Sequence, residues 1–245
     1  MEHIKDGKFL TNGLIGAIIL LLGSAMAHAE PVIMLIYQEI EQNYTKVLVR
    51  KIINAEFMRI DNGKENDGFV LYDRKKQIIY NVSFGDKSIF TINAKKSPVK
   101  APLKFSVREK TVTAETTALL HGKLKHLRFW AGDQLCLNRF ILAGLLPEAI
   151  KAQKEFLEVL AGEHLAVIKN TPQEMQEPCD FALHISHWQQ RFEGGYPVLE
   201  YEYTGKERIL MDFDPTYQLT LPWTQLPLGF KLYSPEKLRS ENLDV

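Results

Sequence analysis

The stretch FMRIDNGKENDGFVLYDRKKQIIYNV, residues 57–82, alternates short apolar runs with polar, turn-forming segments. Runs rich in Ile, Val, Phe and Tyr are typical of β-strands. DNG and NDG supply residues that tolerate the positive φ angles of tight turns. The sequence therefore predicts strands at 57–61, 68–73 and 77–82, paired as an antiparallel meander.

Four acidic residues, Asp61, Glu65, Asp67 and Asp73, lie in this stretch and raise the question of a metal or acid–base site. A calcium-binding EF-hand loop needs oxygen ligands at alternate positions before its glycine, and counting back from Gly68 places Gly63 and Glu65 where Asp or Asn is required. Catalytic carboxylate pairs need contrasting, partly buried environments, whereas a loop of this composition is expected to face solvent. We interpret these acids as turn and edge-strand residues.

The rest of the chain predicts a mixed order of elements. Strands are expected over 32–118, then a helical hairpin over 133–162, strands again over 180–232, and a polar tail over 234–245. In the hairpin, Asp133 caps a first helix that ends at Gly144, and Pro147 starts a second, strongly amphipathic helix. A sheet and a helical pair that each have one apolar face are expected to pack as two layers.

One of the later strands has two chemically different faces. Over residues 197–203, Val198, Glu200 and Glu202 alternate with Leu199, Tyr201 and Tyr203. Because successive side chains of a strand point to opposite faces, one face is expected to be largely acidic and the other apolar and aromatic.

The first 29 residues have the composition of a secretory signal peptide. Lys5 and Lys8 precede the apolar run GLIGAIILLLG, and Ala27-His28-Ala29 provides small residues at a cleavage site. The apolar run is shorter than the roughly 20 residues that a membrane-spanning helix needs. We therefore expect cleavage after Ala29 and export to the periplasm, leaving residues 30–245 as one domain with no transmembrane anchor.

Thirty basic and thirty acidic side chains give a formal net charge of zero. Nucleic-acid-binding proteins normally carry a basic surplus that displaces counterions from phosphates, so this class is not expected. Lys95, Lys96, Lys100 and Lys104 form a local basic cluster that is best interpreted as a solvated loop.

Cys136 and Cys179 are the two cysteines of the chain. An even number of cysteines in an exported protein favours a disulfide. Closing a loop between cysteines 43 positions apart lowers the conformational entropy of the unfolded chain, which is worth about 4 kcal/mol of stability. Two alternatives remain open. Cys179, His184 and His187 have some resemblance to a metal-ligand cluster, and Cys136 near a helix start could be a nucleophile paired with a histidine.

The segments AEFMRIDNG, DGFVLYDRKKQIIYNV and KSIFTI, within residues 55–93, resemble the β-meander of the periplasmic lipoprotein carriers of the lipoprotein-localisation-factor superfamily. The resemblance implies a curved, half-barrel-like antiparallel sheet, covered by helices and enclosing an apolar cavity. It supplies no matching functional residue.

The sequence thus predicts an α+β fold in which a helical hairpin covers a curved antiparallel sheet. We expect a non-enzymatic envelope protein, with no cofactor, metal ion or catalytic residue, that binds a lipid or acyl chain or a hydrophobic segment of an envelope partner. The alternatives are a scaffolding protein in an envelope assembly and an enzyme or metal protein that depends on its Cys and His residues.

Overall fold

The computed structural model describes residues 30–42, 45–93, 105–114, 122–169, 171–172, 175–219, 222–235 and 237. Within these ranges it contains one sheet of twelve strands. The first six are β1 (Glu30–Ile40), β2 (Lys46–Ile53), β3 (Phe57–Asp61), β4 (Phe69–Asp73), β5 (Ile78–Ser83) and β6 (Ser88–Asn93). The other six are β7 (Phe105–Ala114), β8 (Gly122–Ala131), β9 (Gln134–Leu142), β10 (Tyr196–Glu202), β11 (Glu207–Leu219) and β12 (Lys231–Tyr233).

The strand order is β12-β6-β5-β4-β3-β2-β1-β11-β10-β9-β8-β7. All neighbours pair antiparallel except β12 and β6, which are parallel, so the sheet is mixed. The predicted meander over residues 57–82 is confirmed as β3, β4 and β5. Pairing of β1 with β11 joins this N-terminal meander to the strands of the second half.

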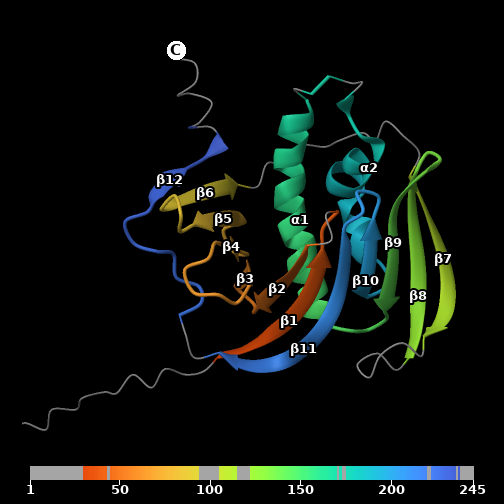
Figure 1. The fold of residues 1–245 in the computed structure, drawn as a ribbon, viewed down its shortest axis with the longest axis horizontal. Helices are drawn as coiled ribbons and strands as arrows, with labels where there is room; N and C mark the ends of the chain where they lie inside the picture. The colour runs from red at the N-terminus through yellow and green to blue at the C-terminus, as the bar shows by residue number, and fades with distance from the viewer. Residues whose placement is uncertain are drawn as a thin grey trace, which may run out of the picture.

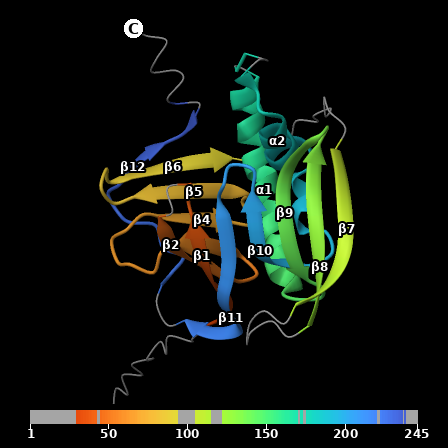
Figure 2. The ribbon, with the colours of Figure 1, turned by 45° about the vertical axis from the view of Figure 1, so that its right-hand side comes forward.

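The long helix α1 (Pro147–Ile168) covers one face of the sheet. Strands β2–β6 lie on one side of α1 and β7–β9 on the other in both ribbon views (Figures 1 and 2). Ala149, Ala152, Phe156 and Val159 of α1 are buried in one cluster with Leu35, Tyr37, Met58, Tyr72 and Ile79 of the sheet. The predicted helix that starts at Pro147 is thus confirmed, and its apolar stripe is what holds it on the sheet.

The prediction of a first helix in the hairpin is wrong, because residues 134–142 form strand β9. Gly132 and Asp133 make the turn between β8 and β9, and Gly132 adopts a φ of 58° there. Asp133 is therefore a turn residue instead of a helix cap. β9 pairs with β8 on one side and β10 on the other, and these two ladders outweigh the helical preference of the isolated segment.

The predicted strand character of residues 180–192 is also wrong. This segment is helical: α2 (Pro178–Asp180), the π-helical turn η2 (Phe181–Ser186) and the 3₁₀ helix η3 (Trp188–Phe192). Cys179, Ala182 and Leu183, which recur at helical spacing, are buried against β8 and β9. The fold is therefore mostly β with few helices, and the α+β class holds in that broad sense.

The disulfide between Cys136 of β9 and Cys179 of α2 is confirmed, with the two Cα atoms 5.1 Å apart. Both residues are fully buried in the cluster that packs α2 and η2 on the sheet. In the described part of the chain, no helix is both long enough and apolar enough to cross a membrane. The predicted signal peptide, the basic cluster at Lys95–Lys104 and most of the predicted tail lie outside the described residues.

The disulfide should be essential for keeping η2 and η3 on the sheet. We expect a Cys136→Ala/Cys179→Ala variant to lose about 4 kcal/mol of unfolding free energy, because the unfolded chain regains the freedom of the closed loop. Urea unfolding followed by far-ultraviolet circular dichroism measures this loss. Dithiothreitol should shift the wild-type midpoint and leave the variant unchanged, and equal wild-type midpoints with and without reductant would contradict the expectation.

Candidate functional site

A row of alternating charges crosses four neighbouring strands. In the register of the sheet, Arg139 of β9 opposes Glu200 of β10, and Glu200 opposes Arg208 of β11. Arg208 in turn opposes Glu39 of β1. Directly opposed residues on one face of a sheet lie close enough for their side chains to pair. The register thus makes an ion-pair ladder of four charged side chains.

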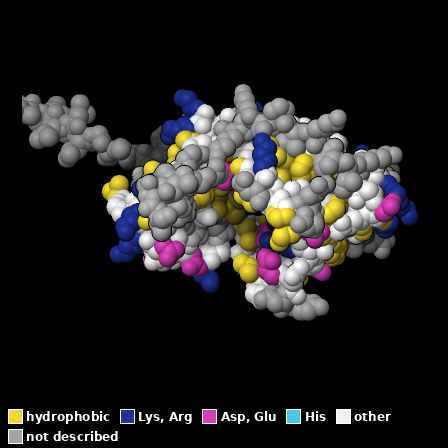
Figure 3. All heavy atoms as spheres, turned by 90° about the horizontal axis from the view of Figure 1, so that it is seen from above, with side chains coloured by type: hydrophobic (Ala, Val, Ile, Leu, Met, Phe, Trp, Pro, Cys, Tyr) yellow, Lys and Arg dark blue, Asp and Glu magenta, His cyan; other side chains and the backbone are white. Residues whose placement is uncertain are grey.

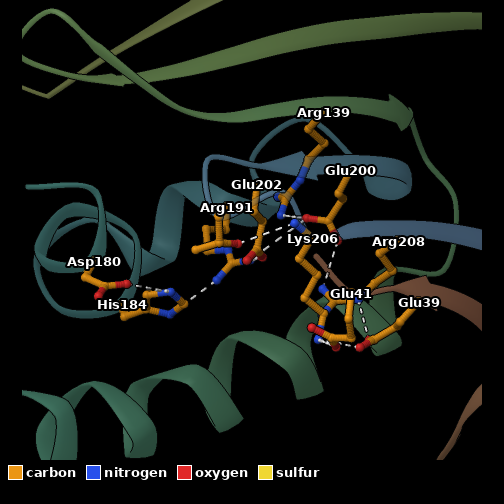
Figure 4. A network of polar contacts seen from close by, with 11 residues as sticks. Glu39, Glu41, Arg139, Asp180, His184, Arg191, Glu200, Glu202, Lys206 and Arg208 are labelled. Carbon is orange, nitrogen blue, oxygen red and sulfur yellow. Dashed lines mark hydrogen bonds and ion pairs between the residues drawn. The ribbon is translucent and has the colours of Figure 1, made fainter. Parts of the chain in front are cut away.

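The ladder is joined by direct contacts (Figure 4). The guanidinium of Arg139 donates a hydrogen bond to Glu200 Oε1, and Arg208 Nη1 lies 3.1 Å from Glu200 Oε2. Arg208 Nε lies 2.7 Å from Glu39 Oε1. Lys206 Nζ lies 2.5 Å from the other oxygen of Glu39 and 3.0 Å from Glu41 Oε1.

Helix η3 adds a third arginine to the ladder. Arg191 Nη2 lies 3.0 Å from Glu202 Oε1 and 4.0 Å from Glu200 Oε1. Since the disulfide fixes α2 and η2 on β9, and η3 follows directly, this covalent link helps to place Arg191 against β10. Arg139, Arg191 and Glu200 are 5% exposed or less.

The carboxyl group of Glu200 is ionised in this setting. Burial alone would raise its pKa, but the guanidinium groups of Arg139, Arg208 and Arg191 outweigh burial and hold the pKa well below its usual range. The same ion pairs raise the pKa of Arg208 against the opposing effect of its burial. Glu200 is therefore a buried full charge that depends on its arginine partners, whereas the outer members Lys206 and Glu41 stay partly exposed to water.

Lys51 of β2 differs from the other cations. It is 8% exposed, and its Nζ lies over the ring of Tyr37, 4.9 Å from the centroid. Among the described residues it forms no ion pair with a carboxylate. Burial, followed by the positive charge of Arg208, lowers the pKa of Lys51 to about 7.

Most of these charged groups line a pocket of about 310 Å³ between α1, η3 and the sheet: Glu39, Lys51, Arg139, Arg191, Glu202, Lys206 and Arg208. Its apolar wall consists of Val49, Ile60, Phe156, Leu157, Leu160 and Phe192. Hydrophobic side chains also border a hollow near the centre of the face seen from above (Figure 3). A concave site with an apolar wall and a few polar groups has the usual character of a small-molecule pocket.

A second pocket of about 320 Å³ lies beside the first and shares His164 and His184 with it. The two imidazole rings are 5.4 Å apart between centroids, and His184 Nε2 lies 3.8 Å from Asp180 Oδ1. Burial, then the charge of Arg191 and the neighbouring His164, lowers the pKa of His184 to about 4. His184 is therefore a neutral side chain at the boundary of the two pockets at neutral pH.

The structure does not bring together the residues of the two alternatives considered for the sequence, a Cys–His catalytic pair and a Cys–His metal site. The disulfide occupies both thiols, so neither Cys136 nor Cys179 is available as a nucleophile or a metal ligand. His187 stacks on Phe105 with 4.2 Å between ring centroids, whereas His184 contacts His164. In the described ranges, no group of three or more His, Cys, Asp or Glu side chains is arranged to hold a metal ion.

The acidic residues of the 57–82 stretch have local partners. Asp61 forms ion pairs with Arg50 and Arg59 at 2.8 and 2.7 Å and accepts the N–H of Gly63. Asp73 accepts the N–H of Lys76 in the next turn. The expected turn contacts are therefore present. The expectation of solvent-facing edge-strand residues is wrong for Asp61 and Asp73, which are 7% and 4% exposed and belong to the inner strands β3 and β4.

The sequence did not point to Lys51, Arg139 or Arg208, and it assigned the acidic face of residues 197–203 no role. In the structure this face, with Val198 and Glu200, is the buried one, whereas Tyr201 is exposed. The available signal was the single basic residues within LNRFIL and ERILM, whose charges complement Glu200.

No protein-family model and no curated protein matches the chain. Among solved structures, an uncharacterised conserved protein from Thermus thermophilus is similar, with 10% identity over 84% of this chain and 91% of that chain and a TM-score of 0.44. Two crystal forms of PNGF-II are similar at 9% and 8% identity, with TM-scores of 0.42 and 0.43. The matches cover 87% and 86% of this chain and 32% of each PNGF-II chain.

Replacing Glu200 by Gln should be strongly destabilising. The change leaves the buried guanidinium groups of Arg139 and Arg191 and the half-buried one of Arg208 short of one negative charge. Breaking a buried ion pair in this way costs about 3–5 kcal/mol. Urea unfolding at pH 7 measures the loss, and Glu158→Gln on the exposed face of α1 is the control, with an expected change below about 0.5 kcal/mol.

The same variant should change the acid profile. Because the pKa of Glu200 is lowered in the fold from 4.5, its contribution to stability is complete above pH 4.5 and is lost as the pH falls below that value. The Glu200→Gln variant should therefore lose less stability than the wild type between pH 4.5 and pH 3. Parallel acid profiles would show that Glu200 is not held ionised by the three arginines.

Replacing Lys51 by Met should stabilise the protein, because the change removes a buried amine and leaves an unbranched apolar side chain of similar length. The pKa of Lys51 is lowered in the fold from 10.5 to about 7, so the cost of burial is largest at pH 7 and below and declines toward pH 10.5. We expect a gain of about 1–4 kcal/mol at pH 6 that shrinks by pH 10. Unfolding at both pH values, with exposed Lys75→Met as the control, measures it, and a less stable Lys51→Met variant at pH 6 would contradict this account.

Proposed function

We propose that the protein is an exported protein of a bacterial envelope that binds a hydrophobic ligand, such as an acyl chain, or a hydrophobic segment of an envelope partner. The observation that carries this proposal is the pocket between α1 and the sheet, whose apolar wall comes from β2, β3, η3 and α1. Covering such a wall with an apolar group is favourable, by about 25 cal/mol for each Å² of apolar surface removed from water. Export is supported by the signal-like N-terminal sequence and by the disulfide, which persists in oxidising compartments.

The pocket adjoins the protein core and shares Phe156 with it. Side chains of α1 and the sheet fill most of the space between them, as the burial of Leu35, Met58, Tyr72 and Phe156 shows. The pocket lies at the border of this cluster, where the packed apolar side chains give way to the ion-pair ladder. A ligand there would extend the core without displacing it, and the proposal therefore requires no unfolding of α1.

The structural-partner alternative is supported by a different observation. Strand β7 is at one end of the sheet and pairs with β8 alone among the described strands. An edge strand of this kind can accept a strand from another protein. Purification of one stoichiometric envelope protein with the chain, together with failure of hydrophobic probes to bind, would favour this role over ligand binding.

Ligand binding is tested with the mature protein purified without detergent. Mass spectrometry of organic extracts should detect a co-purifying lipid or acyl compound, and the delipidated protein should enhance the fluorescence of 1-N-phenylnaphthylamine. Leu160→Trp, which fills the apolar wall, should weaken probe binding by about tenfold, equivalent to about 1.4 kcal/mol. Leu228→Trp, at a position that is 97% exposed, is the matched control and should bind as the wild type does. No extractable compound and no probe uptake would overturn the proposal.

A further inference from the structure

The pocket beneath α1 has more basic residues than carboxylates to pair with them. Its basic residues are Lys51, Arg139, Arg191, Lys206 and Arg208. The carboxylates that line the pocket or pair with these residues are Glu39, Glu41, Glu200 and Glu202, so below pH 7, where Lys51 is protonated, five positive charges face four negative ones. His164 and His184 add no charge at neutral pH, because burial lowers the pKa of both.

Lys51 is the basic residue of the pocket that forms no ion pair with a carboxylate among the described residues. Glu39 is shared by Lys206 and Arg208, Glu200 by Arg139 and Arg208, and Glu202 contacts Arg191. The amine of Lys51 has the ring of Tyr37 beside it in place of a carboxylate. A buried charge without a partner is costly, and an anion in the pocket would remove that cost.

Buried donors without acceptors point to the same kind of ligand. Within the described residues, Arg139 Nε and Nη1, Arg191 Nε and Gln153 Nε2 have no hydrogen-bond partner. Arg139 and Arg191 come from the sheet and η3, while Gln153 comes from α1, and all three side chains line the pocket and are 5% exposed or less. Buried N–H groups are rarely left unpaired in folded proteins, so oxygen acceptors are expected at this site.

The apolar wall restricts what else the ligand carries. Val49, Ile60, Leu157 and Leu160 also line the pocket, with Ile60 directly opposite Lys51 in the register of β2 and β3, and they offer no polar group to a ligand. A volume of about 310 Å³ is at the small end of the range for ligand pockets, roughly 300–1,000 Å³, which favours one chain over the two chains of a diacyl lipid.

We propose that the ligand is a single-chain amphipathic anion, whose compact acidic head contacts Lys51, Arg139 and Gln153 and whose chain lies on Val49, Ile60, Leu157 and Leu160. This inference rests on the proposed function, because it identifies the class of hydrophobic ligand. A carboxylate and a phosphate share the required chemistry, since both present several oxygen acceptors to guanidinium and ammonium groups. Lys51 then serves as the head group's counter-ion.

Three probes of equal chain length test the inference by isothermal titration of the delipidated mature protein at pH 6: dodecanoate, dodecyl phosphate and dodecanol. The wild type should bind at least one of the two anions about tenfold more tightly than dodecanol, a difference of about 1.4 kcal/mol. Tighter binding of dodecanoate assigns a carboxylate head, and tighter binding of dodecyl phosphate assigns a phosphate head.

Variants separate the head group from the chain. Lys51→Met should abolish the preference for the anions and leave dodecanol binding intact, while Lys75→Met, in an exposed turn, should behave as the wild type. Raising the pH from 6 to 8.5 should weaken dodecanoate binding to the wild type by about two- to tenfold, because Lys51 must then take up a proton, and should not weaken it in Lys51→Met. Melting temperatures of both variants verify that they are folded.

The outcomes separate the two proposals. Equal binding of dodecanol and both anions by the wild type, or an anion preference that survives Lys51→Met, would overturn the assignment of the head group while hydrophobic-ligand binding stands. Absence of binding by all three probes, and of probe fluorescence, would overturn both proposals.

Discussion

This part of the structure depends on the buried carboxylate of Glu200, because it contacts guanidinium groups from three separate segments: β9, η3 and β11. Guanidinium groups so close together repel one another, and the low polarity of the interior strengthens that repulsion. The register of β9, β10 and β11 is therefore constrained by charge as well as by backbone hydrogen bonds. A slip of one residue would move Glu200 to the opposite face and leave the arginines buried without it.

Two further anchors hold the elements that complete the pocket. The apolar stripe of α1 fixes Gln153, Leu157 and Leu160 over the sheet, since Phe156 and Val159 of the same helix are buried in the main cluster. The disulfide fixes α2 on β9, and the helical turns that follow carry His184 and Arg191 to the pocket. The site therefore combines residues from both halves of the chain, which the pairing of β1 with β11 brings together.

The sequence predicted the features that depend on neighbouring residues. The meander over 57–82 carries its turn residues within the stretch, including Gly63 and Asn66, which adopt positive φ angles. The start of α1 at Pro147 is likewise a local signal. The prediction of a helix over 134–142 was wrong because Asp133 and Gly144 look like the cap and the end of a helix. The segment forms a strand because it pairs with β8 and β10, which are formed by other parts of the chain. The strong curvature of a covered half-barrel remains an expectation from the resemblance.

The site was not predictable for a physical reason of the same kind. Glu200 and Glu202 alternate with Leu199 and Tyr201, and a strand with this pattern usually buries its apolar face. Here the acidic face is inside, because Arg139 and Arg208 on the neighbouring strands compensate for the cost of burial. Those partners lie 61 and 8 residues away in the sequence, so no local pattern connects all three.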